Sequence, residues 1–196
     1  MSKIVISGYY GFANAGDEAM LTAIIKSLRS TEKSVELTVI SGNPEMTSAQ
    51  HQVNSIHRFN FFEIIKSLHG CDLLISGGGS LLQDVTSMRS LLYYLSILAL
   101  GVILKKKVML FGQGIGPINS RFLRKLTKLI CSHADLITVR DQDSLYELRR
   151  LGVPTQKVQL TADSVLTLPQ EGKDLGKGLL NAFHVPENKM LIAISV

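Results

Sequence analysis

Acidic and cationic side chains that could handle a sugar and an anion lie beside glycine-rich segments. The segment Gly8–Glu18 contains Asn14, Gly16 and Asp17, and Arg140 follows an apolar run. A carboxylate such as Asp17 can hydrogen-bond a sugar hydroxyl or remove its proton. An arginine such as Arg140 can hold a carboxylate or phosphate through parallel hydrogen bonds. A structural alternative stays open for each: Asp17 as a helix-dipole partner, and Arg140 paired with a nearby carboxylate.

Two further glycine-rich segments follow apolar runs. They are Gly77-Gly78-Gly79 and Gly112-Gln113-Gly114-Ile115-Gly116-Pro117. Glycines let a ligand or another backbone come close, and the N–H groups of the second segment can turn toward an anion; tight turns are the alternative. The candidate catalytic residues are Asp17 and Arg140, and the candidate substrate-binding residues are Asn14, Gly16, Gly77, Gly78, Gly79, Gln113, Gly114 and Gly116.

Other kinds of site are disfavoured by spacing. The five histidines follow no metal-binding pattern, and Cys71 and Cys131 belong to no CxxC pair, so we expect no metal and two reduced thiols. The segment Gly8–Glu18 lacks the GxGxxG spacing of dinucleotide-binding proteins. Asp17 and Glu18 would also repel a phosphate at the start of the following helix.

Alternating apolar runs and helical patterns place these loops. Strands are predicted over 3–7, 35–40, 53–57, 72–76, 107–111, 135–139 and 157–160, and helices over 17–30, 61–68, 87–104, 121–131 and 142–151. This alternation is typical of an α/β, Rossmann-like parallel sheet with helices on both faces. Such sheets bind ligands at the carboxyl ends of their strands, where all the candidate loops should lie.

The pattern changes near the end of the chain. Residues 169–172 read as a linker, a helix is predicted near 175–183, and an apolar strand over 190–196. We therefore expect an N-terminal domain over 1–168 and the beginning of a second domain over 169–196.

Composition narrows the choice of partners. The net charge of +5 favours anionic partners, whereas 6% aromatic residues and no tryptophan argue against nucleic acid. The apolar run 91–104 is too short to span a membrane, so we expect a buried helix, with docking on a membrane surface as the alternative. The basic residues of 121–128 form either a solvated face or a patch for anionic lipid. The opening MSKIVISG reads as a strand and not as a signal peptide, which favours the cytoplasm.

Four motifs in order, GYYGFANAGDEAML, GGGSLLQDVTS, FGQGIGP and VRDQDS, resemble the polysaccharide pyruvyl transferase family over residues 3–165, most closely its cell-wall members. The resemblance implies the N-terminal half of a glycosyltransferase-B-like fold, with the active site between two Rossmann-like domains. It implies phosphoenolpyruvate as co-substrate, with no cofactor. The acceptor would be N-acetylmannosamine of a lipid-linked wall precursor at the inner membrane face. The product would be a 4,6-ketal that anchors S-layers.

The resemblance also suggests roles for residues. Arg140 matches the family's VR(D/E)xxS arginine and would bind the anionic donor, while Asp17 and Asn14 would face the acceptor diol. The segments 77–79 and 113–116 would shape the cleft floor. Because a histidine and further basic residues of the family fall in the second half, we expect this chain alone to be inactive. Two alternatives stay open: a glycosyltransferase of the same fold that uses a nucleotide sugar, and a non-catalytic glycan-binding module.

Overall fold

A computed structural model describes residues 1–170, 172–186, 190–192 and 194. Its core is one eight-stranded parallel sheet in the order β3-β2-β1-β4-β6-β7-β8, with β5 paired to β6. The strands are β1 (Lys3–Ser7), β2 (Glu36–Ser41), β3 (Asn54–His57), β4 (Leu73–Ser76), β5 (Gly79–Leu82), β6 (Lys107–Ile115), β7 (Leu136–Val139) and β8 (Val158–Leu160). The predicted α/β, Rossmann-like class is confirmed.

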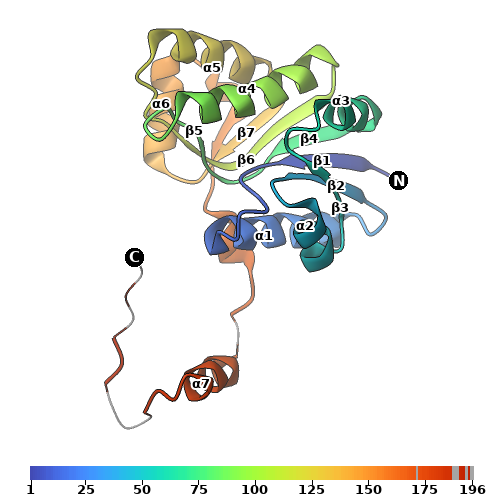
Figure 1. Ribbon diagram of the computed structural model, residues 1–196. Helices are drawn as coiled ribbons and strands as arrows, with labels where there is room; N and C mark the ends of the chain where they lie inside the picture. The colour runs from blue at the N-terminus through green and yellow to red at the C-terminus, as the bar shows by residue number, and fades with distance from the viewer. Residues whose placement is uncertain (171, 187–189, 193, 195–196) are drawn as a thin grey trace.

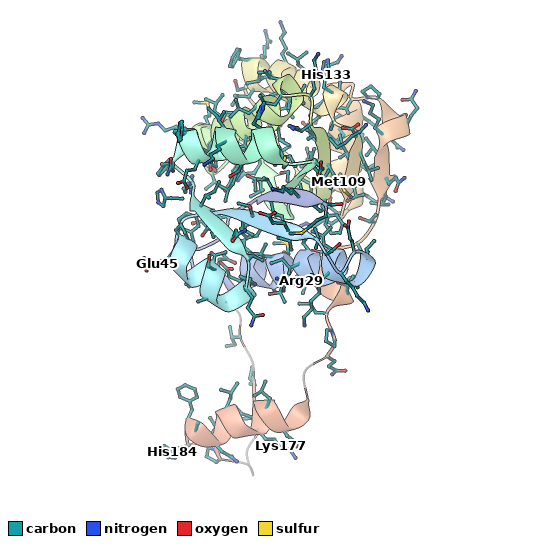
Figure 2. The ribbon with its side chains drawn as sticks, turned by 90° about the vertical axis from the view of Figure 1, so that its right-hand side faces the viewer. Arg29, Glu45, Met109, His133, Lys177 and His184 are labelled. Carbon is teal, nitrogen blue, oxygen red and sulfur yellow. The ribbon has the colours of Figure 1, made fainter. Side chains whose placement is uncertain are left out.

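The helices cover both faces of the sheet (Figure 1). One face carries α1 and α2, and the other carries α3 to α6. Their bounds are α1 (Ala15–Thr31), α2 (Pro44–His51), α3 (Phe61–Gly70), α4 (Met88–Ile103), α5 (Arg121–His133) and α6 (Gln142–Leu151). In the side view of Figure 2, Arg29 and Glu45 of the first layer lie on one side of Met109 in the sheet, and His133 lies on the other.

Two apolar clusters hold these layers together. One joins α1 to β1 and β2 through side chains such as Ile6, Leu21 and Ile24. The larger one joins α3 to α6 to the opposite face, and includes Leu95 and Leu110. Burying one such side chain stabilises the fold by ~1.5–3 kcal/mol. Because both faces are covered, the central strands are almost uniformly apolar.

The region around the glycine-rich segments differs from the prediction. Gly79–Leu82 forms β5, which pairs with β6, so the glycine triplet joins two strands and does not lead directly into a helix. β6 continues to Ile115 through the glycines that we expected to form a loop. Glycine has low strand propensity, and the pairing with β5 and β7 that stabilises this stretch comes from distant residues.

A short 3-10 helix, η1 (Thr155–Lys157), leads into β8, and after β8 the chain leaves the sheet through a second one, η2 (Ser164–Thr167), which packs against α1. It then forms α7 (Lys173–Ala182), which Figure 1 shows apart from the sheet. Of the strand predicted over 190–196, the described residues 190–192 and 194 form none. A strand needs a neighbour for its backbone groups, and these side chains are exposed. Residues 193, 195 and 196 lie outside the described part.

Candidate functional site

The candidate loops meet at one edge of the sheet. Ser7 of β1 lies opposite Ser76 of β4, and Gln113 of β6 lies opposite Val139 of β7. All these strands are parallel, so the segments that follow them leave from the same carboxyl edge. The strand order reverses between β1 and β4, which is where open α/β sheets form a ligand crevice. The prediction that these segments share one edge is confirmed.

Asp17 lies in the first turn of α1, directly beside the glycine triplet. Gly79 has φ +89°, and a Cβ built on it would lie 3.1 Å from Oδ1 of Asp17. This glycine therefore lets β5 approach the carboxylate. Burial raises the pKa of Asp17 and the charge of Glu18 adds to the rise, whereas Arg140 lowers it; the net pKa is above the ordinary value. A half-buried carboxylate with a raised pKa is suited to proton transfer.

Arg140 follows β7 and lies among acidic and hydroxyl groups. Its Nη1 donates to Asp163 at 2.9 Å, its Nη2 donates to Ser80 at 3.0 Å, and its Nε is 3.6 Å from Asp141. The structural alternative, a pairing with nearby carboxylates, is therefore present. The side chain nevertheless keeps 28% of its surface exposed. A guanidinium carries five N–H donors, and among the described residues only two oxygens accept from it.

Asp141 both caps α6 and helps position Arg140. Its Oδ1 accepts from the Ser144 N–H at 2.7 Å, so Asp141 is the N-cap of α6. Partial burial raises the pKa of Asp141, but the hydrogen bonds from Ser144 and the charge of Arg140 outweigh it and lower the pKa overall. Asp141 therefore keeps its negative charge beside the guanidinium.

Gln113 and Gly114 connect the strands beneath this site. Gln113 is fully buried; its amide donates to the Gly79 carbonyl at 2.6 Å and accepts from Ser76 at 3.1 Å. It can therefore reach a ligand only indirectly, by fixing the glycine triplet. A Cβ on Gly114 would lie 2.7 Å from the Ser80 hydroxyl and 3.3 Å from Nη2 of Arg140. Gly114 thus leaves room for the Ser80–Arg140 contact.

Two of the remaining glycines make space for side chains that pack from α1 and the loop before it. A Cβ on Gly77 would lie 2.1 Å from the Tyr10 hydroxyl, and one on Gly78 would lie 2.7 Å from the Met20 sulfur. Gly116, with φ +79°, lies against Glu147 in the same way. These three glycines shape the edge through packing.

Asn14 and Gly16 form the start of α1. The Asn14 side-chain oxygen accepts from the N–H groups of Gly16 and Asp17 at 3.0 and 3.2 Å, so Asn14 is the N-cap. The side chain is exposed. A Cβ on Gly16 would meet only the Asn14 oxygen, at 3.4 Å, so packing does not require this glycine.

The buried side chain of Glu18 fixes the loop between β1 and α1. It is buried, it accepts from the Gly11 N–H at 2.8 Å, and its other oxygen lies 3.1 Å from Nε2 of the buried His51. Both side chains are over nine-tenths buried. Glu18 therefore points inward and ties the loop to α2, although the sequence placed it beside Asp17 as a first-turn acid.

Cavities occur at both edges of the sheet. One of about 360 Å³ lies at the carboxyl edge, lined by Ser80, Gly114, Gly116, Asp141 and Glu147 among others. Another of about 380 Å³ lies at the amino edge, around Lys3, Glu36 and Cys71, and contains none of the candidate residues. The first is part of the candidate site, and its acidic lining suits hydroxyl donors better than a bare anion.

Sequence reasoning missed two residues of this site, Ser80 and Asp163. Ser80 stands directly after the glycine triplet, and Asp163 ends the short stretch after β8. Asp163 also caps η2 through the Val165 N–H at 3.1 Å. The signal for Asp163 was its position after a predicted strand, as for Arg140.

Within the described residues, no group of three or more histidine, cysteine, aspartate or glutamate side chains could hold a metal ion. Over the same part of the chain, no helix combines the length and apolar character that crossing a bilayer requires. The apolar α4 is instead a buried helix, as predicted, with Leu91, Leu95 and Leu98 in the core.

Solved structures of similar fold come from sugar-nucleotide proteins. Anabaena Alr3699/HepE in complex with UDP-glucose matches with a TM-score of 0.62 and 13% identity, covering 96% of this chain and 51% of that one. The UDP-GlcNAc 2-epimerase of Neisseria meningitidis, bound to UDP-GlcNAc, matches with a TM-score of 0.58 and 13% identity, covering 96% and 54%. These likenesses confirm a glycosyltransferase-B-like, Rossmann-type fold.

A match to a family model, beside one more distant relative, shows the family of this chain. The amylovoran biosynthesis protein AmsJ of Erwinia amylovora is 25% identical over 236 residues, covering 99% of this chain and 56% of the relative. The chain thus spans about half the length of the curated relative that it matches. Residues 14–194 match the family described as polysaccharide pyruvyl transferase. The chain therefore belongs to the polysaccharide pyruvyl transferase family.

Proposed function

We propose that the protein transfers pyruvate from phosphoenolpyruvate to a polysaccharide or its precursor, with phosphate as the other product. The observation that carries the proposal is the meeting of Asp17, Gly79 and Arg140 at one sheet edge, in a chain that matches the family over residues 14–194. Residues 1–168 would form the N-terminal domain, and residues from 169 on would lead into a second domain that closes the cleft.

The reaction forms one C–H bond and two C–O bonds, and it breaks two O–H bonds and the C–O bond to phosphate. The methylene carbon of phosphoenolpyruvate is protonated, and a sugar hydroxyl oxygen adds to the central carbon. A second hydroxyl of the same sugar then displaces phosphate from that carbon. The two hydroxyl groups release two protons. One offsets the proton that the methylene carbon takes up to become a methyl group, and the other leaves with phosphate. The product is a cyclic ketal, which on a 4,6-diol is a six-membered ring.

Asp17 and Arg140 divide this chemistry between them. Asp17 removes a proton from an acceptor hydroxyl, a role that its raised pKa favours because a stronger base accepts the proton more readily. Arg140 binds the carboxylate or phosphate of the donor with the N–H groups that Ser80 and Asp163 leave free. Asn14, the N-cap of the helix whose first turn contains Asp17, helps to bind the hydroxyls of the acceptor.

The acceptor that we propose is N-acetylmannosamine of a lipid-linked cell-wall precursor, modified at the cytoplasmic side of the membrane for S-layer anchoring. The basic face of α5 supports a membrane contact. Arg121, Lys125 and Lys128 line a cavity of about 280 Å³ there, and Phe122 and Leu129 are exposed on the same helix. Basic residues beside exposed apolar side chains favour anionic lipid surfaces.

A comparison of donors tests the proposal. The complete protein is incubated with a saccharide acceptor and either phosphoenolpyruvate or UDP-glucose, and released phosphate and UDP are measured. A nucleotide sugar is the competing donor because HepE and the 2-epimerase were solved with such ligands. We expect acceptor-dependent phosphate release and a new methyl signal in the proton spectrum of the glycan. Release of UDP alone would replace the proposal with glycosyl transfer, and glycan binding without either product would leave a binding module.

A further inference from the structure

An aromatic cluster lies at the same edge as the candidate site, and the proposed reaction makes no use of it. Tyr9 and Phe12 come from the loop after β1, Phe59 follows β3, and Tyr93 comes from α4. The rings of Phe12, Phe59 and Tyr93 contact Arg58, and the Tyr9 ring stacks on Phe12. We call these four rings and Arg58 the aromatic platform.

Two rings of the platform stack on each other, two meet edge to face, and the platform is partly open to solvent. The Tyr9 and Phe12 rings lie nearly parallel, with centroids 4.3 Å apart and an interplanar angle of 10°. Tyr9 is 37% exposed, Phe12 40% and Phe59 61%. Apolar rings usually bury their area, and contiguous exposed apolar surface often marks a binding site. Packing alone therefore does not explain why the rings of Tyr9, Phe12 and Phe59 stay exposed at this edge.

The guanidinium of Arg58 contacts the faces of three rings of the platform. Its guanidinium carbon lies 4.6, 4.8 and 5.3 Å from the ring centroids of Tyr93, Phe59 and Phe12. The Tyr93 hydroxyl also donates to the Arg58 carbonyl at 3.1 Å. Among the described residues no carboxylate pairs with Arg58, and its buried Nε has no hydrogen-bond acceptor. The cation is thus balanced mainly by ring faces.

The loop that carries Tyr9 and Phe12 is fixed in place. Glycine is needed at position 42, because a Cβ there would lie 2.5 Å from the Phe12 ring. The Gly42 N–H donates to the Tyr10 carbonyl at 2.9 Å, and Glu18 holds the Gly11 N–H. The rings are therefore positioned before any ligand arrives, which lowers the entropy lost on binding.

The platform is continuous with the candidate site. Phe12 and Asp17 belong to the same loop and helix start. The ring of Tyr94, the next residue in α4, lies 5.2 Å from that of Tyr93. Burial raises the pKa of Tyr94 most and Arg58 lowers it, while the charges of Tyr93, Asp17 and Tyr9 add to the rise. The platform and the carboxylate therefore belong to one continuous segment of the sheet edge.

We propose that the aromatic platform is the subsite where a pyranose ring of the saccharide acceptor stacks, which places a hydroxyl near Asp17. The C–H groups of one pyranose face are apolar and complement the negative face of an aromatic ring, while the hydroxyls at its rim face the polar groups of the edge. A nucleobase would also stack on these rings, but the phosphates of a nucleotide would meet the carboxylate of Asp17 in the first turn of α1. UDP is therefore the competing ligand in the test. The inference rests on the proposed function only in naming the saccharide as the acceptor.

Ligand binding to the 196-residue chain tests this subsite without catalysis. The probes are the methyl glycosides of N-acetylmannosamine, glucose and galactose, and UDP serves as the nucleobase probe. Saturation-transfer NMR measures binding to the wild type, Tyr9→Ala, Phe12→Ala and the conservative Tyr9→Phe. Phe62→Ala is the matched control, because Phe62 is exposed on α3 and belongs to none of the ring contacts of the platform. Circular dichroism confirms that each variant is folded.

We expect at least one glycoside to bind the wild type, Tyr9→Phe and Phe62→Ala alike, and to lose about tenfold in affinity with Tyr9→Ala or Phe12→Ala, the equivalent of about 1.4 kcal/mol. Equal binding by folded Ala variants, no binding of any glycoside by the wild type, or ring-dependent binding of UDP alone would overturn the inference. Its failure is separate from that of the proposed function, which is decided by phosphate release from phosphoenolpyruvate. In the complete protein, Tyr9→Ala should raise KM for the acceptor and leave KM for phosphoenolpyruvate unchanged.

Discussion

The buried contact between Glu18 and His51 determines whether the first loop can hold its position. Replacing Glu18 by alanine removes two hydrogen-bond acceptors at once. The Gly11 N–H loses its partner at 2.8 Å, and Nε2 of His51 loses its partner at 3.1 Å. Both side chains are over nine-tenths buried, so water cannot readily replace the carboxylate. The loop between β1 and α1 should loosen together with the fold.

The size of the effect follows from these two contacts. A hydrogen bond to a charged group contributes about 1.5–3 kcal/mol, and breaking a buried pair typically costs about 3–5 kcal/mol. We therefore expect Glu18→Ala to lower the free energy of unfolding by about 3–5 kcal/mol. In a chain of this length that corresponds to a fall in Tm of roughly 10 °C. Glu18→Gln keeps the shape and one acceptor oxygen, and should lose about half as much.

Urea unfolding followed by circular dichroism measures these differences. Glu45→Ala is the matched control, because Glu45 is also a first-turn glutamate but is exposed. It should cost no more than about 1 kcal/mol. If Glu18→Ala were no more destabilised than Glu45→Ala, the buried pair would not anchor the loop, and the reasoning would be refuted.

Three further predictions concern the site and its surroundings. Because the pKa of Asp17 is raised in the folded protein, the ionisation of Asp17 lowers the free energy of unfolding as pH rises through that pKa. Asp17→Asn should therefore be more stable than the wild type at neutral pH, and its activity should lose the acidic limb of the pH–rate profile. An unchanged acidic limb would count against Asp17 as the base. Gly77→Ala should lose about 1–3 kcal/mol in urea unfolding because its Cβ would overlap the buried Tyr10 hydroxyl, and a neutral effect would show that this contact relaxes easily. Lys125→Glu with Lys128→Glu should abolish cosedimentation with phosphatidylglycerol vesicles while binding to phosphatidylcholine stays weak for all variants; retained binding would argue against α5 as the membrane contact.

The parallel sheet and its functional edge could be predicted from the sequence. Each candidate segment follows an apolar run, and parallel strands bring all such segments to one side, so the sequence places Asp17 and Arg140 at one edge. The capping role of Asp141 was equally local, since an aspartate before a helical pattern accepts from the first-turn N–H groups. These features depend on neighbours in the sequence.

The remaining features depend on partners far apart in the sequence. Arg140 joins Ser80 and Asp163, which are far apart in the sequence, within one site. β5 exists because β6 pairs with it, although its four residues show no strand pattern of their own. The inward turn of Glu18 required His51, which is 33 positions away. Arg58 gathers rings from three separate elements in the same way.

The central claim is that Arg140 binds the anionic donor of a pyruvyl transfer at this edge. Its most direct test is the rate of phosphate release from phosphoenolpyruvate by the complete protein, compared between the wild type, Arg140→Ala and Arg89→Ala, an exposed arginine of α4. We predict a loss of about 10²–10³-fold in kcat for Arg140→Ala, no change for Arg89→Ala, and little loss of stability in either, because a partly exposed ion pair contributes at most about 1 kcal/mol. A folded Arg140→Ala protein that releases phosphate at the wild-type rate would contradict the account.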